Sequence, residues 1–187
     1  MAKIAVIIGS TRPNRFGPKV AAWFMEVAIK SNEAEFELVD IADYNLPILD
    51  ENVPSGNSQE HTRIWQAKMG EFDGFVIITA EHNHSFPASL KNAIDFVNNE
   101  FSYKPVAYVG YGGEGAVRAV EQLRQIAATF RQYDLKPQVV IAGQGNFTDV
   151  DTDFVPGEKH LRNAEVIIKE ISFWAREMAS IREKLKT

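Results

Sequence analysis

Two arginines near the start of the chain stand in a loop that joins an apolar strand to an apolar helix. In the stretch IAVIIGSTRPNRFGPKVAAWF (4–24), Arg12 and Arg15 follow the hydroxyls of Ser10 and Thr11, and the loop contains no acid that could neutralise them. A helix N-terminus favours an anion, and guanidinium groups bind phosphate oxygens through bonds of about 1.5–3 kcal/mol each. We therefore predict a phosphate site whose affinity comes from the arginines, with solvated loop arginines as the alternative.

A second polar loop, EHNHS at 81–85, follows the apolar run GFVIIT and precedes Pro87, a residue typical of a helix start. Three uses are open: hydrogen bonding and stacking against a planar heterocycle, a metal site through His82 and His84, or acid–base work by a histidine. The metal is the weakest, because the other two histidines are distant in sequence and the chain has no cysteine. We predict no metal and expect the loop to face a planar ligand.

A third loop is rich in glycine. The stretch GYGGEGAVRA begins at Gly110 and places Gly112, Gly113 and Gly115 before a helix. Glycine lets a ligand approach bare backbone, and the ring of Tyr111 could cover a planar ligand; the alternative is a flexible turn. The first loop has neither the GxxxxGK[ST] nor the GxGxxG pattern, which disfavours nucleoside triphosphate hydrolysis and the usual dinucleotide fold.

Five short apolar runs alternate with helical patterns and must position these loops. The runs predict strands at 3–9, 36–41, 74–79, 105–110 and 137–143, and apolar stripes predict helices at 17–30, 58–70, 87–99, 115–131 and 158–185. Because strands and helices alternate as in right-handed βαβ units, we predict an α/β fold, a three-layer flavodoxin-like sandwich with a five-stranded parallel sheet in the order 2-1-3-4-5. The three loops then follow strands one, three and four, where such sheets bind ligands.

The composition is that of an ordinary globular chain. With 187 residues, 45% of them hydrophobic, and no linker rich enough to divide it, the sequence predicts one domain over 1–187. A net charge of −5 argues against a nucleic-acid surface, and without cysteine any redox chemistry needs a bound cofactor. No run reaches the roughly 18 apolar residues of a membrane span, so we expect a cytoplasmic location. The irregular segments 42–57 and 144–157 follow strands and are candidate pocket walls.

Taken together, the three loops resemble the NADPH-dependent FMN reductase family of flavodoxin-like proteins, which includes quinone, chromate and azo-dye reductases. The resemblance spans nearly the whole chain and rests on GSTRPNRFG, on GYGGEGAVRAVEQLR and above all on EHNHSFPASLKNAIDF, which is similar to the family motif P-E-Y-N-x-S-x-P-x-x-L-K-N-A-I-D-W. It implies two sets of FMN-binding residues. The phosphate set is Ser10, Arg12, Arg15, Phe16 and Gly17, and the set around the isoalloxazine ring is Glu81, His82, Asn83, His84, Ser85, Gly110, Tyr111, Gly112 and Gly113.

The resemblance also implies an activity. NADPH or NADH passes a hydride to the flavin and leaves, and a quinone or similar small molecule then takes two electrons, so no side chain is needed as a nucleophile. The chain departs from the family at Ala80, where Pro is common, and at His82, where Tyr is common; His82 is a candidate proton donor. The family also implies a homodimer or a dimer of dimers, with 87–99 and 115–131 as candidate interface helices.

Two other functions stay open at this point. One is a flavodoxin-like electron carrier without a substrate of its own, although such carriers resemble one another in a phosphate loop without arginine and in a strongly acidic surface. The other is a redox-sensing flavin-binding module, which the changed residues Ala80 and His82 leave possible. The sequence favours the enzyme, and it leaves the acceptor and the choice between NADPH and NADH undetermined.

Overall fold

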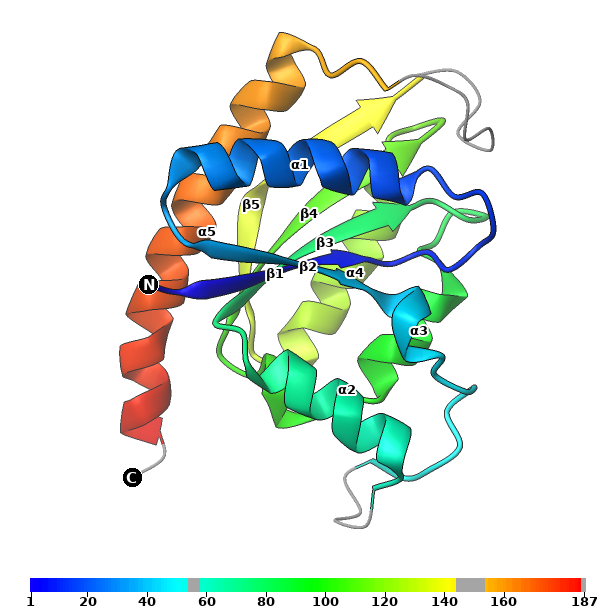
Figure 1. The fold of residues 1–187 in the computed structure, drawn as a ribbon, viewed down its shortest axis with the longest axis vertical. Helices are drawn as coiled ribbons and strands as arrows, with labels where there is room; N and C mark the ends of the chain where they lie inside the picture. The colour runs from blue at the N-terminus through cyan, green and yellow to red at the C-terminus, as the bar shows by residue number, and fades with distance from the viewer. Residues whose placement is uncertain (54–57, 144–153, 186–187) are drawn as a thin grey trace.

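Five parallel strands form one sheet in the centre of the protein (Figure 1). The computed structural model describes residues 1–53, 58–143 and 154–185. The strand order, β2-β1-β3-β4-β5, confirms the predicted order 2-1-3-4-5. The strands are β1 (Lys3–Ile8), β2 (Glu35–Asp40), β3 (Gly74–Ala80), β4 (Pro105–Gly112) and β5 (Tyr133–Ala142). The helices are α1 (Gly17–Ser31), α2 (Glu60–Gly70), α3 (Ala88–Asp95), α4 (Val117–Thr129) and α5 (Glu158–Leu185), with short 3-10 helices η1 (Ile41–Tyr44) and η2 (Asn99–Phe101).

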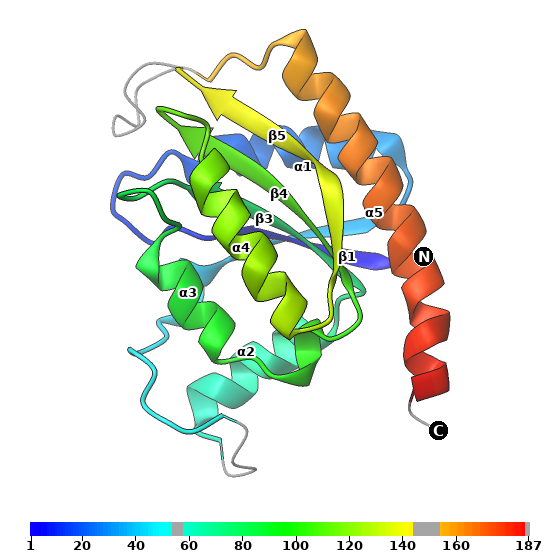
Figure 2. The same cartoon turned by 180° about the vertical axis from the view of Figure 1, so that it is seen from behind.

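Helices cover both faces of the sheet, as Figures 1 and 2 show from opposite sides. Helices α1 and α5 lie on one face, where Val20 and Ile168 join Val6 in a buried cluster. Helices α2, α3 and α4 lie on the other face, where their apolar residues contact Ile7. Consecutive side chains of a strand point to opposite faces, so a run such as KIAVII must be apolar throughout when both faces are covered. Among the described residues, no helix combines the length and the apolar character that crossing a membrane requires.

Two elements, β5 and α3, differ from their predicted ranges by more than two residues at one end. Strand β5 begins at Tyr133 rather than near residue 137, because its first half mixes polar and apolar residues, as suits a strand at the edge of a sheet. An edge strand also tolerates Pro137. Helix α3 ends at Asp95 rather than at 99, and η2 follows it. Helix α5 spans the predicted residues 158–185.

All the parallel strands run in the same direction, so their first residues lie along one side of the sheet and their last residues along the opposite side. We call these two sides the amino edge and the carboxyl edge; they are distinct from the outermost, or edge, strands β2 and β5. In the sheet register, Ile8 at the end of β1 lies between Asp40 of β2 and Ile78 of β3, and Ala80 of β3 pairs with Tyr111 of β4. The loops that follow β1, β3 and β4 therefore leave the sheet as neighbours (Figure 1). These are the three loops that the sequence predicts to bind a ligand.

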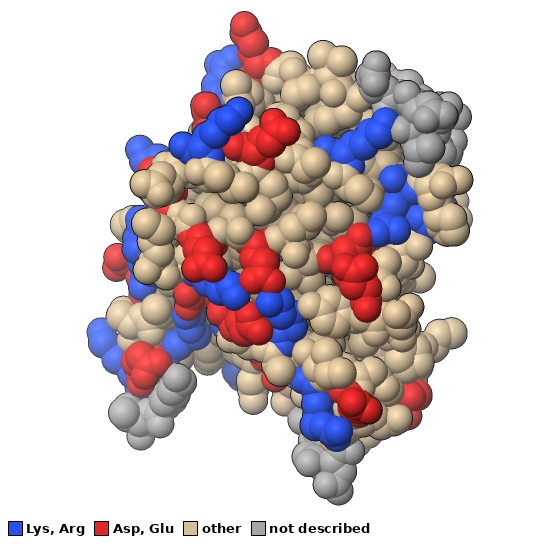
Figure 3. Space-filling view, in the orientation of Figure 1, with Lys and Arg blue, Asp and Glu red and all other residues tan. Residues whose placement is uncertain are grey.

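A closed group of charges lies near the amino edge. Lys3 Nζ is 2.8 Å from Glu37 Oε2 and 2.8 Å from Glu71 Oε2, while Lys68 Nζ is 2.5 Å from Glu37 Oε1 and 2.9 Å from Glu71 Oε2. Figure 3 shows acidic and basic side chains intermixed on the side of the protein where β2 and α2 lie. Each of these four side chains thus has two partners of opposite charge.

Candidate functional site

The loop after β1 is fixed against β3 and α3. The Gly9 N–H donates to the Ile78 carbonyl (3.0 Å), and the Gly9 carbonyl accepts from Ser89 Oγ (2.8 Å). A Cβ atom at Gly9 would lie 2.9 Å from Leu90 Cδ2, so a larger residue would push α3 away. The loop therefore sits at the reversal of strand order, where open α/β sheets bind ligands.

Arg15 has an acidic partner that lies outside its own loop. Its Nη2 forms an ion pair with Asp40 Oδ2, and both side chains are largely buried. The prediction from the loop alone, that both arginines lack an acid, is therefore wrong for Arg15. The signal was present in the predicted strand order, which puts the end of strand two beside the end of strand one, and Asp40 is level with Ile8. The Nε of Arg15 is buried without a hydrogen-bond partner in the part of the chain described, so one donor is left for a ligand.

Arg12 is the exposed arginine of this loop, and its backbone N–H lies 3.4 Å from the buried Ser10 Oγ. Its charge acts on both of the other loops. Burial, and then the charge of Arg12, lower the pKa of His82. Burial raises the pKa of Tyr111 to about 12 against the opposing charges of Arg12 and Arg15. The sheet register places the ends of β1, β3 and β4 side by side, and the charge of Arg12 is accordingly felt in all three loops at the carboxyl edge.

Phe16, Gly17 and Tyr111 form a buried cluster beneath the first loop. Phe16 and Tyr111 are 1% and 3% exposed, and their ring centroids lie 6.0 Å apart. A Cβ atom at Gly17 would lie 2.9 Å from the Tyr111 hydroxyl, which is hydrogen-bonded to the Gly17 backbone. The Tyr111 ring supports the loop from inside and does not cover a planar ligand, which corrects that prediction for its side chain. Phe16 likewise can offer only its backbone to a phosphate.

The second loop is a tight turn that the chain itself holds in shape. His82 and Ser85 exchange backbone hydrogen bonds of 2.7 and 3.0 Å. Between them, Asn83 and His84 have φ angles of 50° and 66°. Two central residues with positive φ are the mark of a type I′ turn, which leaves the backbone little freedom. The exposed side chains of Asn83 and His84 therefore stand at fixed positions on the carboxyl edge.

Side chains of helix α4 form hydrogen bonds with both ends of this turn. At one end, Glu81 Oε1 accepts a 2.6 Å hydrogen bond from Arg118 Nε and also pairs with Arg118 Nη2. The other carboxylate oxygen, Glu81 Oε2, is buried and has no hydrogen-bond partner among the described residues. At the other end, Gln122 Nε2 donates to the His84 carbonyl (2.8 Å) and Gln122 Oε1 accepts from Ser85 Oγ (2.7 Å). Arg118 and Gln122 are not among the residues predicted from the sequence, although their spacing of four places them on one helix face.

His82 lies partly buried in this turn. Its lowered pKa, caused by burial and by the Arg12 charge, favours the neutral imidazole near pH 7. Within the described ranges, neither His82 nor His84 belongs to a group of three side chains whose ligand atoms could share a metal ion. The electrostatics here suit hydrogen bonding by a neutral imidazole better than a second positive charge.

The third loop places bare backbone beside the second. A Cβ atom at Gly110 would lie 2.3 Å from the Gly115 carbonyl oxygen, and one at Gly115 would lie 2.3 Å from a β5 side chain, so the packing of this loop requires both glycines. Gly112 has a φ of 145°, and a Cβ atom there would lie 3.8 Å from Glu81 Cβ. Gly113 has no atom near its missing side chain among the described residues. Gly112 and Gly113 are therefore the positions where a ligand can approach the backbone.

A cavity of about 310 Å³ opens beside the first loop. It is lined by Thr11, by residues after β2 and by residues of α3, namely Ile41, Ala42, Asn45, Leu46, Ser89 and Asn92. Asn92 fixes the outer segment, since its Nδ2 donates to the Pro47 carbonyl (2.6 Å) and its Oδ1 accepts from the Leu49 N–H (2.9 Å). The predicted pocket wall at 42–57 is confirmed where its residues line this cavity. Residues 54–57, and 144–153 of the other candidate wall, lie outside the described part of the chain.

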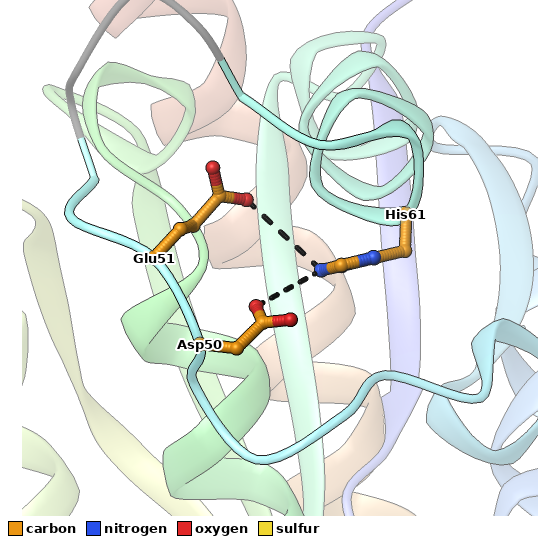
Figure 4. Close-up of side chains that lie close together, drawn as sticks. All are labelled: Asp50, Glu51 and His61. Atoms are coloured by element: carbon orange, nitrogen blue, oxygen red, sulfur yellow. Dashed lines mark hydrogen bonds and ion pairs between the residues drawn. The ribbon is translucent and has the colours of Figure 1, made fainter.

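A separate cluster of Asp50, Glu51 and His61 lies at the start of α2 (Figure 4). His61 Nε2 is 3.3 Å from Asp50 Oδ1 and 4.0 Å from Glu51 Oε1. Both Glu51 oxygens accept from the Gln59 N–H, at 3.3 and 3.1 Å, and Oε1 also accepts from the Thr62 hydroxyl. The first turn of a helix lacks internal partners for its N–H groups, so Glu51 acts as a cap. We interpret this cluster as the tie between α2 and the segment after β2.

The fold and the three converging loops define a flavodoxin-like α/β protein with a ligand site at the carboxyl edge of its sheet. The model of the NADPH-dependent FMN reductase family matches residues 2–146. The chain therefore belongs to the NADPH-dependent FMN reductase family. This confirms the family predicted from the loops and, with it, the class of enzyme, an FMN-dependent oxidoreductase that uses NAD(P)H.

Several characterised proteins are similar in sequence. The chain is 38% identical over 130 residues to an NAD(P)H-dependent FMN reductase of Schizosaccharomyces pombe, covering 67% of this chain and 65% of that protein. It is 34% identical over 159 residues to the NAD(P)H-dependent FMN reductase ntnL of Nectria sp, covering 80% and 79%. It is 34% identical over 129 residues to a quinone reductase of Pseudomonas putida, covering 64% and 67%. The chain thus spans about two thirds of the first and third of these relatives.

Solved structures confirm the fold. FerB, a flavoenzyme NAD(P)H:(acceptor) oxidoreductase from Paracoccus denitrificans, superposes with a TM-score of 0.76 at 22% identity, covering 95% of this chain and 99% of that one. RosB superposes with a TM-score of 0.73 at 12% identity, covering 96% and 81%. At these identities the likeness concerns the three-layer flavodoxin-like sandwich alone.

Proposed function

We propose that the protein is an FMN-dependent NAD(P)H oxidoreductase that reduces quinones or similar small electrophiles. The observation that carries the proposal is the meeting of three loops at the carboxyl edge, where Arg15 Nε and Glu81 Oε2 are buried without hydrogen-bond partners among the described residues. Three loops that meet at one place supply positive charge, a polar turn and bare backbone, which are what a phosphorylated planar heterocycle needs. The quinone class is drawn from the relatives of that name.

The residues of the carboxyl edge fit an FMN molecule. Arg12 is exposed and Arg15 keeps a buried, unpartnered Nε, which suits a phosphate at the start of α1. Glu81 Oε2 is a buried acceptor without a partner among the described residues, and Glu81 Cβ lies beside the bare backbone of Gly112. A buried acceptor of this kind calls for a donor, and a heterocycle with a ring N–H offers one.

When bound, FMN supplies the hydride and electron transfer, because the flavin carries both kinds of chemistry. The chain binds and orients it. Ser10, Arg12, Arg15 and the start of α1 would hold the phosphate, while residues 81–85 and 110–113 would frame the ring. His82 contributes hydrogen bonds from its neutral form, since its lowered pKa leaves little imidazolium at neutral pH. A role for His82 as a proton donor is a prediction that would require acidic conditions for its full effect.

The proposal includes a homodimer or a dimer of dimers with α3 and α4 at the interface, and a cytoplasmic location. An exposed apolar segment next to α3 supports an interface there, because Ile48 and Leu49 are 89% and 40% exposed while Asn92 holds their segment in place. Sedimentation velocity over a range of protein concentrations tests the assembly. A single species of monomer mass at all concentrations would contradict it.

Stopped-flow absorbance of the FMN-reconstituted protein tests the activity. Mixing with NADPH or NADH should bleach the flavin at least as fast as the protein turns over in the steady state. Addition of benzoquinone should then restore the flavin colour. Bleaching that stays slow with both nucleotides in excess would contradict a reductase and favour an electron carrier or a redox sensor. The nucleotide that bleaches faster at equal concentration is the preferred reductant.

A further inference from the structure

We infer that Arg118 and Gln122 of α4 are positioning residues for the flavin ring, because they hold the second loop, residues 81–85, in the shape that faces the ligand. The inference rests on the proposed function, since it concerns the same site. Both residues belong to α4 and lie outside residues 9–17, 81–85 and 110–113. Both act through backbone and side-chain groups of residues 81–85.

The two residues clamp the loop at both ends. Arg118 binds Glu81, the first residue of the loop, through Nε (2.6 Å) and Nη2. Gln122, one helical turn later, binds the last two residues through the His84 carbonyl (2.8 Å) and Ser85 Oγ (2.7 Å). A helix places residues four apart on the same face, so one rigid element fixes the span of the turn.

The backbone conformation of the second loop is one that needs support from its surroundings. Asn83 and His84 both have positive φ, a conformation that residues other than glycine rarely adopt and keep only where their surroundings hold it. Inside the loop, the described hydrogen bonds are the backbone pair between His82 and Ser85. The side-chain hydrogen bonds that the structure describes for this loop come from α4, so their loss should let the turn relax away from the ring.

The Glu81–Arg118 pair also controls charge beside the ring. The Glu81 side chain is 8% exposed, whereas the Arg118 side chain is 42% exposed. Arg118 contacts only Oε1, and Oε2 is buried without a hydrogen-bond partner among the described residues. Without Arg118 the buried carboxylate would be uncompensated, which is costly and would oppose the addition of electrons to a nearby ring. A purely structural residue would not change the reduction potential in this way.

Helix α4 offers a matched control. Arg124 lies on the same helix and also forms an ion pair, with Nη1 2.6 Å from Asp134 Oδ1, and it donates to the Leu135 carbonyl (2.8 Å). These partners belong to β5 and not to the second loop. Arg124→Gln therefore removes an arginine–carboxylate pair from α4 and leaves the loop clamp intact.

The experiment measures binding of FMN and of riboflavin, which has the same ring without the phosphate, by quenching of flavin fluorescence on titration with apoprotein. Arg118→Gln should weaken both ligands by about tenfold, the size expected for one lost charge-assisted hydrogen bond, and keep the preference for FMN over riboflavin. Gln122→Ala should weaken both by a smaller factor. Arg124→Gln should bind both as the parent does. The midpoint potential of the FMN complex should become more negative in Arg118→Gln and stay near the parent value in Arg118→Lys, which keeps the charge.

The inference is overturned if Arg118→Gln and Gln122→Ala both bind the two flavins as tightly as the parent. It is also overturned if Arg124→Gln weakens binding equally, or if only FMN is affected, since the first result would mean a general helix effect and the second a phosphate effect. If Arg118→Gln does not fold, Gln122→Ala and Arg118→Lys decide, because Gln122 is exposed and its replacement leaves the core untouched. A parent protein that binds neither flavin would fail at the first titration, which overturns the proposed function and this inference together.

Discussion

The amino edge and the carboxyl edge of the sheet both carry charged side chains, but they use them differently. Near the amino edge, Lys3 and Lys68 share Glu37 and Glu71, and each of the four has two partners. Hydrogen bonds to Glu37 and Glu71 raise the pKa of Lys3, and those from Lys3 and Lys68 lower the pKa of Glu37. The four side chains of this network therefore find their oppositely charged partners within the chain.

At the carboxyl edge, two charged groups each have a partner and one atom without a hydrogen bond. Arg15 pairs with Asp40 but keeps an unpartnered Nε, and Glu81 pairs with Arg118 but keeps an unpartnered Oε2, within the described part of the chain. Buried polar atoms are normally satisfied. Two further unpartnered atoms among the described residues, Gln132 Nε2 and Ser172 Oγ, belong to neutral side chains, whereas the two on charged groups both lie at the carboxyl edge and indicate where a ligand binds. Charged side chains that are paired throughout stabilise the fold, and charged side chains that keep an unpaired atom mark the site.

Removing the two arginines of the first loop should give the largest effect and tests whether the carboxyl edge binds the FMN phosphate. Arg12→Ala/Arg15→Ala should weaken FMN binding by about 100-fold or more, because two charge-assisted contacts of about 1.5–3 kcal/mol each are lost, and leave riboflavin binding nearly unchanged. Fluorescence titration of the apoprotein measures both. Arg176→Ala, which removes a donor to the Glu33 carbonyl far from the site, is the control and should bind FMN as the parent does. Equal losses for FMN and riboflavin would contradict the phosphate assignment.

Lys104 is the exception at the amino edge and offers the next largest effect. It is 6% exposed, its Nζ reaches the Met69 carbonyl at 3.4 Å, and burial lowers its pKa to about 8, with Arg182 adding to the shift. Because the unfolded chain binds more protons between pH 8 and about 10.5, the stability of the parent should rise with pH over that range. At pH 7 the penalty is fully present, so Lys104→Met should be more stable by on the order of 2 kcal/mol.

Chemical denaturation of parent and Lys104→Met at several pH values measures this difference. The gap between them should close as the pH passes from 8 to about 10.5. Lys136→Met, at an exposed position of β5, serves as the control and should show no such change. A variant less stable than the parent at pH 7 would mean that Lys104 is satisfied, like its neighbours at this edge.

Replacing a glycine by alanine should change the free energy of unfolding in opposite directions at the two edges. Gly110→Ala places a Cβ atom 2.3 Å from a backbone oxygen at the carboxyl edge and should lower the free energy of unfolding by about 1–3 kcal/mol. Gly70→Ala, at the end of α2, meets no atom within 4 Å among the described residues and should raise it by about 0.4–1 kcal/mol. Urea denaturation measures both. Similar effects at the two positions would show that the third loop can adjust without glycine.

The smallest effect concerns His82. Burial and the Arg12 charge lower its pKa, so the unfolded state binds more protons below the ordinary value of about 6.5 and stability is lost as the pH falls through that range. His82→Gln should therefore lose less stability than the parent between neutral and acidic pH, measured by the thermal midpoint. A parent and a His82→Gln variant with the same acid dependence would place His82 in a more exposed setting.

Much of the fold follows from short-range patterns in the sequence. Runs such as KIAVII and GFVIIT are apolar at every position because both sheet faces are covered, and so their strands are found within one residue or so of the predicted ends. The first half of β5 was harder to predict because an edge strand mixes polar and apolar residues. Phe96 and Val97 are buried beyond the last turn of α3, and the apolar stripe could not distinguish them from further helix.

The site was predictable where its residues lie in one loop and unpredictable where partners come from elsewhere. The loops at 9–17, 81–85 and 110–113 are contiguous, so their residue types were visible in the sequence. The Asp40 partner of Arg15 and the α4 residues that clamp the second loop depend on contacts over 25 to 38 positions. The burial of the Tyr111 ring depends on Phe16 and Gly17, which a strand pattern does not reveal.

The most direct test of the central claim is amide hydrogen exchange of the apoprotein with and without FMN, read by mass spectrometry. We expect FMN to slow exchange in residues 9–17, 81–85 and 110–113 at the carboxyl edge and to leave the amino edge around Lys3, Asp73 and Lys104 unchanged. Protection that appears at the amino edge, or that misses the three loops while FMN is bound, would contradict the account.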